Sequence, residues 1–184
     1  MKRVLVVMCA VGLLVLAAMA EESASPSSAK TRVGVYDSRA IAVAFINSQV
    51  YKDTDGKKLN EMIAEHDKAK AEGNKKRVDE LEAWGKEQQT LLHKQGFSTA
   101  PVDGILIHIK DQMPEIAKTA GVVAIVSKWD KETLAKYKSA ELVDVTMALV
   151  NAFHPTERQL KAAIEIQKHD PLPLEQIDKG HGHK

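Results

Sequence analysis

Cysteine is nearly absent from this 184-residue sequence: the single cysteine, Cys9, lies in an apolar run near the N-terminus. If that run is removed during export, the remaining chain has no disulfide, although the compartment would permit one. Packing must then hold the fold, with self-association as a further source of stability.

Aromatic residues and an excess of one charge are also missing. Phe, Trp and Tyr make up 4% of the chain, which favours long charged helices over a β-sandwich or barrel. The chain has 26 basic and 25 acidic residues, and without Lys2 and Arg3 the basic count becomes 24 and the net charge −1. This balance argues against nucleic acid as a partner, because phosphate binding needs a concentrated basic surface.

Sequence motifs of enzymes are absent as well. The chain has no glycine-rich phosphate loop, no Gly-x-Ser-x-Gly, no His-Glu-x-x-His and no metal-type cysteine pair. We therefore expect a protein that is not an enzyme, with no catalytic residue, no cofactor-binding residue and no metal-ligating residue.

Two short patterns invite a metal interpretation, and neither completes it. Asp53 and Asp55 are spaced as in a calcium loop, but the twelfth position from Asp53 is Ala64, where that loop needs Glu. A helix-breaking turn is the better account. His181 and His183 offer two imidazoles, fewer than the three or four fixed ligands of a metal site, and the sequence alone leaves metal binding by this tail open.

Residues 1–20 are typical of a secretory signal peptide. Two basic residues precede an apolar run from Val4 to Leu16, and Ala18-Met19-Ala20 fits signal peptidase. An uncleaved membrane anchor is the weaker interpretation, because a spanning helix needs about 20 apolar residues. We expect cleavage after Ala20 and a mature chain without a transmembrane segment.

Residues 21–30 are Ser- and Ala-rich and predict a flexible lead-in, followed by one domain over residues 31–153. Alternating valines predict a short strand from Thr31 to Tyr36. Asp37 or Ser38 is expected to cap the helix that follows.

A charged helical region at about residues 57–95 comes next. Two helical patterns, Lys57 to Glu72 and Lys75 to Lys94, flank a Gly-Asn turn, and their narrow apolar stripes predict an antiparallel helical hairpin. His66 and His93 can approach each other across it, where a seam histidine is more common than a catalytic one. The alternative is two helices lying flat on a globular core.

The second half of the chain predicts further helices and one more strand. A helix that Pro114 kinks or restarts precedes the β-branched run from Val122 to Val126, which is typical of a buried strand. Ala140 to Phe153 has the pattern of an amphipathic helix. Residues 154–184 are expected to hold one more helix and a polar tail.

Three stretches then suggest a family. Arg32 to Ile41 (RVGVYDSRAI), Ile116 to Lys128 (IAKTAGVVAIVSK) and Ala135 to Val150 (AKYKSAELVDVTMALV) follow one another in this order. They resemble, in turn, the first strand, the returning strand and the terminal segment of the Skp/OmpH family of periplasmic chaperones. The resemblance covers residues 31–153.

The resemblance implies an α+β, mainly helical fold in which two short strands form a small β body that oligomerisation completes. A homotrimer with projecting, coiled-coil-like helical hairpins would act as an ATP-independent holdase in the periplasm. Its partners would be unfolded outer-membrane or other envelope proteins on their way to assembly, and no cofactor is implied. No client-binding residue transfers by motif.

Three departures from the family keep a second function open. The arm at about residues 57–95 is shorter than the family's arms, its return limb is broken at Gly96 to Gly104, and the mature chain is nearly neutral. Residues 154–184 also have no counterpart in the resemblance. The short arm and the neutral surface favour the alternative of a non-enzymatic structural or adaptor subunit of the cell envelope with the same fold.

Overall fold

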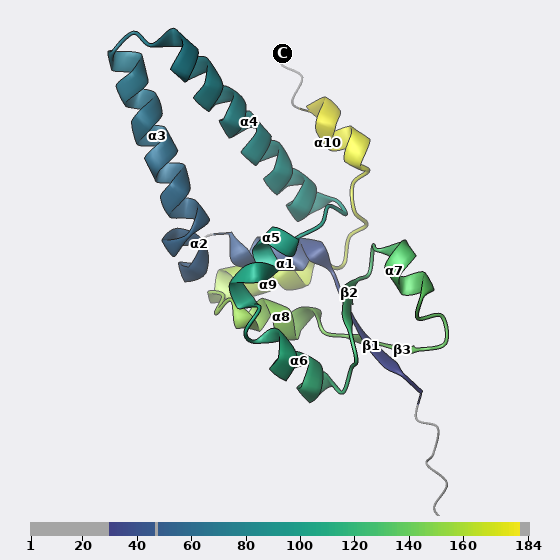
Figure 1. Cartoon of the computed structure of the whole chain (residues 1–184). Helices are drawn as coiled ribbons and strands as arrows, with labels where there is room; N and C mark the ends of the chain where they lie inside the picture. The colour runs from purple at the N-terminus through teal and green to yellow at the C-terminus, as the bar shows by residue number, and fades with distance from the viewer. Residues whose placement is uncertain (1–29, 47, 181–184) are drawn as a thin grey trace, which may run out of the picture.

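A computed structural model describes residues 30–46 and 48–180 (Figure 1). The predicted signal peptide, the rest of the lead-in before Lys30, and His181 and His183 lie outside these residues. The described chain is mainly helical around a small sheet, as the sequence predicts. The helical part forms a body and a two-limbed arm that extends from it (Figure 1).

The sheet has three parallel strands in the order β2-β1-β3. Strand β1 (Arg32–Tyr36) lies in the centre, and β2 (Ile125–Ser127) and β3 (Glu141–Asp144) flank it. Val35 of β1 is paired with Val126 on one side and with Asp144 on the other. All three strands therefore end at the same edge of the sheet, and the residues that follow them meet there.

The expectation of two strands was wrong, because Glu141–Asp144 forms a third strand where a helix was expected from Ala140 onward. The amide of Glu141 donates to the carbonyl of Thr31, and the amide of Val145 donates to the carbonyl of Val35, at 2.9 Å each. Asp144 accepts from the amide of Thr146, so the helix begins only after the strand has ended.

The two longest helices, α3 (Asp55–Ala71) and α4 (Lys75–Phe97), form the arm, and the other helices are shorter. The bounds of these shorter helices are α1 (Ser38–Phe45), α2 (Gln49–Asp53), α5 (Asp103–Leu106), the 3₁₀ turn η1 (Ile107–Ile109), α6 (Met113–Ala120), α7 (Lys131–Ala135), α8 (Thr146–Ala152), α9 (Glu157–Ile166) and α10 (Leu174–Gly180). Pro114 lies in the first turn of α6, where its missing amide hydrogen costs nothing, so it restarts the helix. Gly121 ends α6 at φ 64°, a left-handed conformation that favours glycine.

Helix α1 is the centre of the hydrophobic core. Nearly all its side chains are buried, and it packs against α8, α9, α5 and the base of α4. Of the two residues that the sequence offered as its cap, Asp37 or Ser38, Asp37 caps it by accepting from the amide of Arg39. The largest apolar side chains of the core are fully buried and come from four segments: Ile41, Phe45, Val102, Ile109, Leu149, Val150 and Phe153.

The C-terminal region is more structured than a polar tail. Thr156 and Gln159 form a capping box at the start of α9. After α9 the chain crosses to the base of the arm, where the amide of Leu172 donates to the carbonyl of Phe97 at 2.8 Å. Helix α10 then packs on α4 with Ile177 buried, an interaction between distant segments that composition does not reveal.

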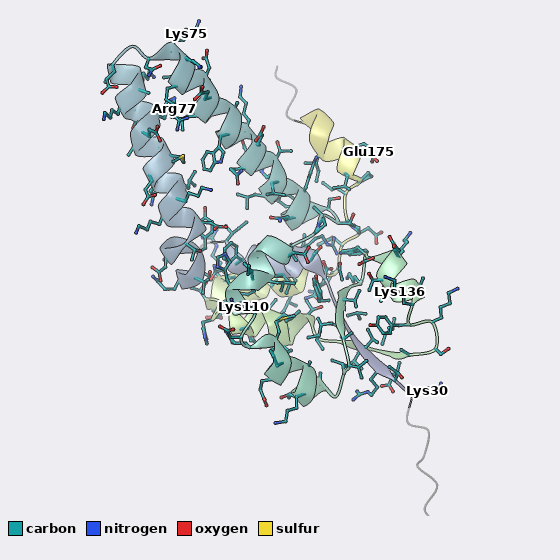
Figure 2. All side chains as sticks on the ribbon, in the orientation of Figure 1. Lys30, Lys75, Arg77, Lys110, Lys136 and Glu175 are labelled. Carbon is teal, nitrogen blue, oxygen red and sulfur yellow. The ribbon has the colours of Figure 1, made fainter. Side chains whose placement is uncertain are left out.

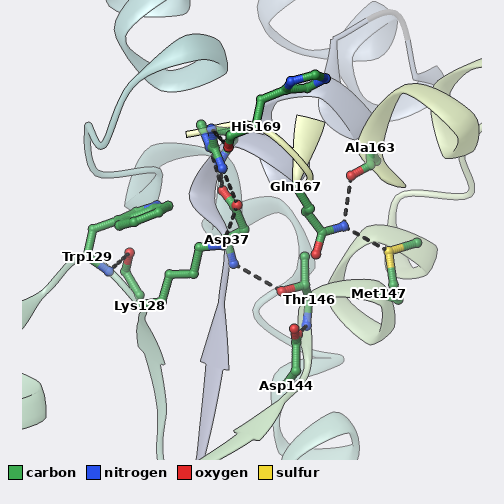
Figure 3. A network of polar contacts seen from close by, with 11 residues as sticks. Asp37, Lys128, Trp129, Asp144, Thr146, Met147, Ala163, Gln167 and His169 are labelled. Atoms are coloured by element: carbon green, nitrogen blue, oxygen red, sulfur yellow. Dashed lines mark hydrogen bonds and ion pairs between the residues drawn. The ribbon is translucent and has the colours of Figure 1, made fainter. Parts of the chain in front are cut away.

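A buried ionic cluster joins these parts at the carboxyl edge of the sheet (Figure 3). The carboxylate of Asp37 accepts from Nε and Nη2 of Arg39 at 3.0 and 2.7 Å, and Nζ of Lys128 lies 2.6 Å from it. The amide of Asp37 donates to Oγ1 of Thr146, and Nη1 of Arg39 donates to the carbonyl of His169. Asp37 and Arg39 together thereby link the end of β1 to the end of β2, the start of α8 and the segment after α9.

The side chains of Asp37 and Arg39 are 0% and 1% exposed, so neither charge is solvated by water and each must be neutralised by the other charges of the cluster. Burial alone raises the pKa of Asp37, but the hydrogen bonds and positive charges of Arg39 and Lys128 outweigh it and hold that pKa below its ordinary value. The folded chain therefore binds a proton at Asp37 less readily than the unfolded chain does. The stabilisation is complete above the ordinary carboxyl pKa and is lost as the pH falls below it.

We expect Asp37→Asn to lower the free energy of unfolding by about 3–5 kcal/mol at pH 7, because it leaves buried positive charge unpaired. The wild-type protein should also lose stability as the pH falls below about 4, with a shallower loss in the variant. Urea denaturation followed by circular dichroism measures both. Asp111→Asn, on the exposed turn before α6, is the matched control and should change stability by about 0.5 kcal/mol or less. Equal effects of the two substitutions would show that the cluster does not hold the fold.

Candidate functional site

The arm consists of α3, which leads away from the body, and α4, which returns to it (Figure 1). Gly73 makes the turn at φ 70°, and Asn74 caps α4 by accepting from the amide of Arg77. Figure 2 shows Arg77 at this tip, where its Nε lies 2.8 Å from Oε1 of Glu65 on the other limb. The pair is partly exposed and contributes little stability, but it fixes how the limbs meet.

The apolar side chains of the limbs that are buried lie in the half of the arm nearer the tip. Ala69 of α3 and Leu81 of α4 are buried, the latter 6% exposed. The ion pair at the tip also affects titration: the guanidinium of Arg77 keeps the pKa of Glu65 below its ordinary value, with the hydrogen bond between them as the main cause.

Towards the body the side chains of the two limbs no longer fill the space between them. Two apolar cavities occupy that space. The first has a volume of about 120 Å³ and lies between α3 and α4. The second, of about 240 Å³, lies where the arm joins the body. Leu59 and Trp84 line both cavities, which therefore form one groove along the inside of the arm. We call this the arm groove, and its main apolar lining residues are Leu59, Met62, Ile63, Trp84, Leu91 and Leu92.

The body supplies the floor of the arm groove. Phe45 of α1, Tyr51 of α2 and Ile105 of α5 line its wider end. The rings of Phe45 and Tyr51 meet edge to face at 5.5 Å, and the imidazole of His108 stacks on Phe45 at 5.1 Å. The floor is therefore part of the hydrophobic core.

Large apolar side chains of the groove remain open to solvent. Ile63 is 50% exposed and Leu91 is 44% exposed. Nζ of Lys58 lies 6.0 Å from the ring of Trp84, at the outer limit of a cation–π contact. Residues 55–97 carry acidic and basic side chains in equal number, so the rim selects no sign of charge. The arrangement suits an extended segment with apolar side chains.

The histidines predicted to face each other do not meet. Nε2 of His66 lies 3.7 Å from Glu82, and His93 is eleven residues further along α4, about 16 Å at 1.5 Å per residue. His93 instead contacts the ring of Phe97. Within residues 30–46 and 48–180, no three His, Cys, Asp or Glu side chains group as ligands of a metal ion.

The Asp53–Asp55 pattern marks a break between helices, as expected. Helix α2 ends at Asp53 and α3 begins at Asp55, with Thr54 between them donating its hydroxyl to the carbonyl of Val50. This break turns the chain from the body into the arm. In the part of the chain that the structure describes, no helix has both the length and the apolar character needed to cross a membrane.

No family model, no curated protein and no solved structure matches this chain. The likeness to the Skp/OmpH family therefore rests on the three sequence stretches alone, and the arm groove is the structural feature that bears on function. Sequence patterns found the limbs of this groove but not its floor, because Phe45 and Tyr51 come from helices outside the predicted hairpin.

We expect Leu81→Ala to cost about 2–3 kcal/mol and to raise amide hydrogen exchange near the tip of the arm, because it empties the contact between the limbs. Leu91→Ala is the matched control, since the same atoms are removed from a half-exposed position, and it should change stability by less than about 1 kcal/mol. Hydrogen exchange measured by mass spectrometry reports both. Fast exchange near the tip in the wild type, unchanged by Leu81→Ala, would contradict a closed tip.

Proposed function

We propose that this protein is an ATP-independent, exported holdase that binds unfolded outer-membrane or other envelope proteins in the periplasm. The observation that carries the proposal is the arm groove, an open apolar surface between two charged helices. A holdase needs no nucleotide and no catalytic group, only a surface that accepts many sequences. The non-enzymatic reading and the Skp/OmpH likeness are parts of the same proposal.

The arrangement of the arm supports this proposal. Its tip is closed by Leu81 and Ala69, its floor is part of the hydrophobic core, and the limbs between them enclose unfilled apolar space. Limbs that are held only at their ends can change their separation at small cost, so one groove can accommodate different apolar segments. The exposed side chains of Ile63 and Leu91 would gain free energy when a client covers them.

A homotrimer with projecting antiparallel hairpins belongs to the proposal as well. The sheet consists of three short strands, and Leu142 is 55% exposed on its outer strand β3. Contact between protomers at this edge would cover that side chain and enlarge a small core. Light scattering on residues 21–184 should give a trimer mass, and a monomer mass would remove this part of the proposal.

We expect the purified mature protein to suppress aggregation of a urea-denatured porin without ATP. The double substitution Ile63→Ser and Leu91→Ser should weaken the apparent affinity by about tenfold or more, because each buried aliphatic side chain contributes about 1.5–3 kcal/mol. Light scattering during dilution of the denatured porin measures the effect.

The matched control is Ile107→Ser with Ile164→Ser, two aliphatic side chains of similar exposure that lie outside the arm groove. This control should suppress aggregation as the wild type does. If the wild type fails to suppress aggregation, the holdase function is wrong. A single stable partner in pull-downs from envelope extracts would then favour the structural or adaptor subunit.

A further inference from the structure

A second cavity lies away from the arm groove, at the carboxyl ends of β1 and β2. Its volume is about 360 Å³, near the lower end of the range of small-molecule sites. In open sheets of parallel strands, ligands bind just outside the carboxyl ends of the strands. They bind at the switch point, where the chain connections from two neighbouring strands run to opposite sides of the sheet. Here β2 and β3 lie on opposite sides of β1. We call this space the carboxyl-end cavity, and the lining residues that carry the argument are Tyr36, Asp103, Ser127, Trp129, Asp130 and Thr133.

The charged side chains that line the carboxyl-end cavity are both acidic. Asp103 begins α5, and Asp130 caps α7 by accepting from the amide of Thr133 at 2.9 Å. That hydrogen bond is the main reason why the pKa of Asp130 lies below its ordinary value, so this carboxylate is ionised at neutral pH. None of the described residues that line the cavity is Lys, Arg or His.

The neighbouring cations already have a partner. Lys128 and Arg39 are both paired with Asp37, and they lie 4.6 and 5.3 Å from the centre of the Trp129 ring. Figure 3 shows Lys128 and Trp129 beside this cluster. Lys136, whose charge also lowers the pKa of Asp130, lies outside the lining as well. The two carboxylates therefore have no basic side chain in the lining of the cavity, and a bound cation would pair with them.

Polar and aromatic groups complete the site. Burial, and then the charges of Asp103 and Asp130, raises the pKa of Tyr36 to about 12, so its phenol remains a hydrogen-bond donor and acceptor. A ligand with a cationic group would pair with the two carboxylates, and the side chains of Tyr36 and Trp129 would line the space around its apolar part.

We propose that the carboxyl-end cavity binds a small organic cation with an ammonium or guanidinium group, either free or as the end of an Arg or Lys side chain in a peptide. The carboxylates of Asp103 and Asp130 would hold the cation, and Tyr36 and Trp129 would form the walls. This site is separate from the arm groove, and it stands or falls independently of the holdase function.

The indole N–H signals in an NMR spectrum of the mature protein test this proposal. The chain has two tryptophans, and Trp84→Phe assigns the signal that belongs to Trp129. Agmatine represents the free cation, an acetyl-Gly-Arg-Gly-amide peptide represents the side chain, and 1-pentanol is the uncharged control. We expect agmatine, the peptide or both to shift the Trp129 signal at millimolar concentration, and 1-pentanol to leave it unchanged.

Asp103→Asn with Asp130→Asn should weaken this binding by about tenfold or more, because hydrogen bonds to charged groups are the stronger ones. Asn still caps α7, so the fold is retained. Asp111→Asn, which removes a carboxylate outside the cavity, should bind as the wild type does. The proposal is wrong if neither cation shifts the signal, if 1-pentanol shifts it equally, or if Asp111→Asn weakens binding as much as the double variant does. A shift by only one of the two cations supports the proposal and identifies its source.

Discussion

The buried carboxylate of Asp37 is the constraint on which the rest of the structure depends. Because Asp37 and Arg39 are shielded from water, each must be paired, and their partners come from chain segments that are far apart in the sequence. Lys128 fixes the end of β2, Thr146 fixes the start of α8, and the carbonyl of His169 fixes the segment after α9. A single ionic cluster thus joins the start of α1 to the end of β2, the start of α8 and the segment after α9.

This arrangement gives the molecule a closely packed body and an arm whose residues are mostly exposed. The segment held by His169 continues to Leu172, whose amide donates to the carbonyl of Phe97 at the end of α4. The returning limb is therefore connected to the ionic cluster through this segment. The leading limb starts at the break after Asp53, and the two limbs pack closely only near Leu81. The arm groove exists because the limbs are held at both ends and not in the middle.

The sequence alone predicted the features that depend on local pattern. The turn at Gly73 was predicted directly, and the cap at Asp37 and the restart at Pro114 were each one of two alternatives that the sequence offered. All three depend on preferences that neighbouring residues determine. The sequence-based prediction failed where the structure depends on contacts between segments that are far apart in the chain. Leu142 and its neighbours fit a helical stripe as well as a strand, and only pairing with β1 decides between them. The groove floor at Phe45 was equally hidden, because its role depends on where the arm leaves the body.

The central claim is that the arm groove binds non-native polypeptide. Hydrogen exchange of the full mature chain, with and without a urea-denatured porin, tests it most directly. The account predicts that added protection is concentrated in residues 55–97 and in the floor around Tyr51 and Ile105. Protection confined to the sheet edge at residues 141–144, with an unchanged arm, would contradict the account and place the client elsewhere on the molecule.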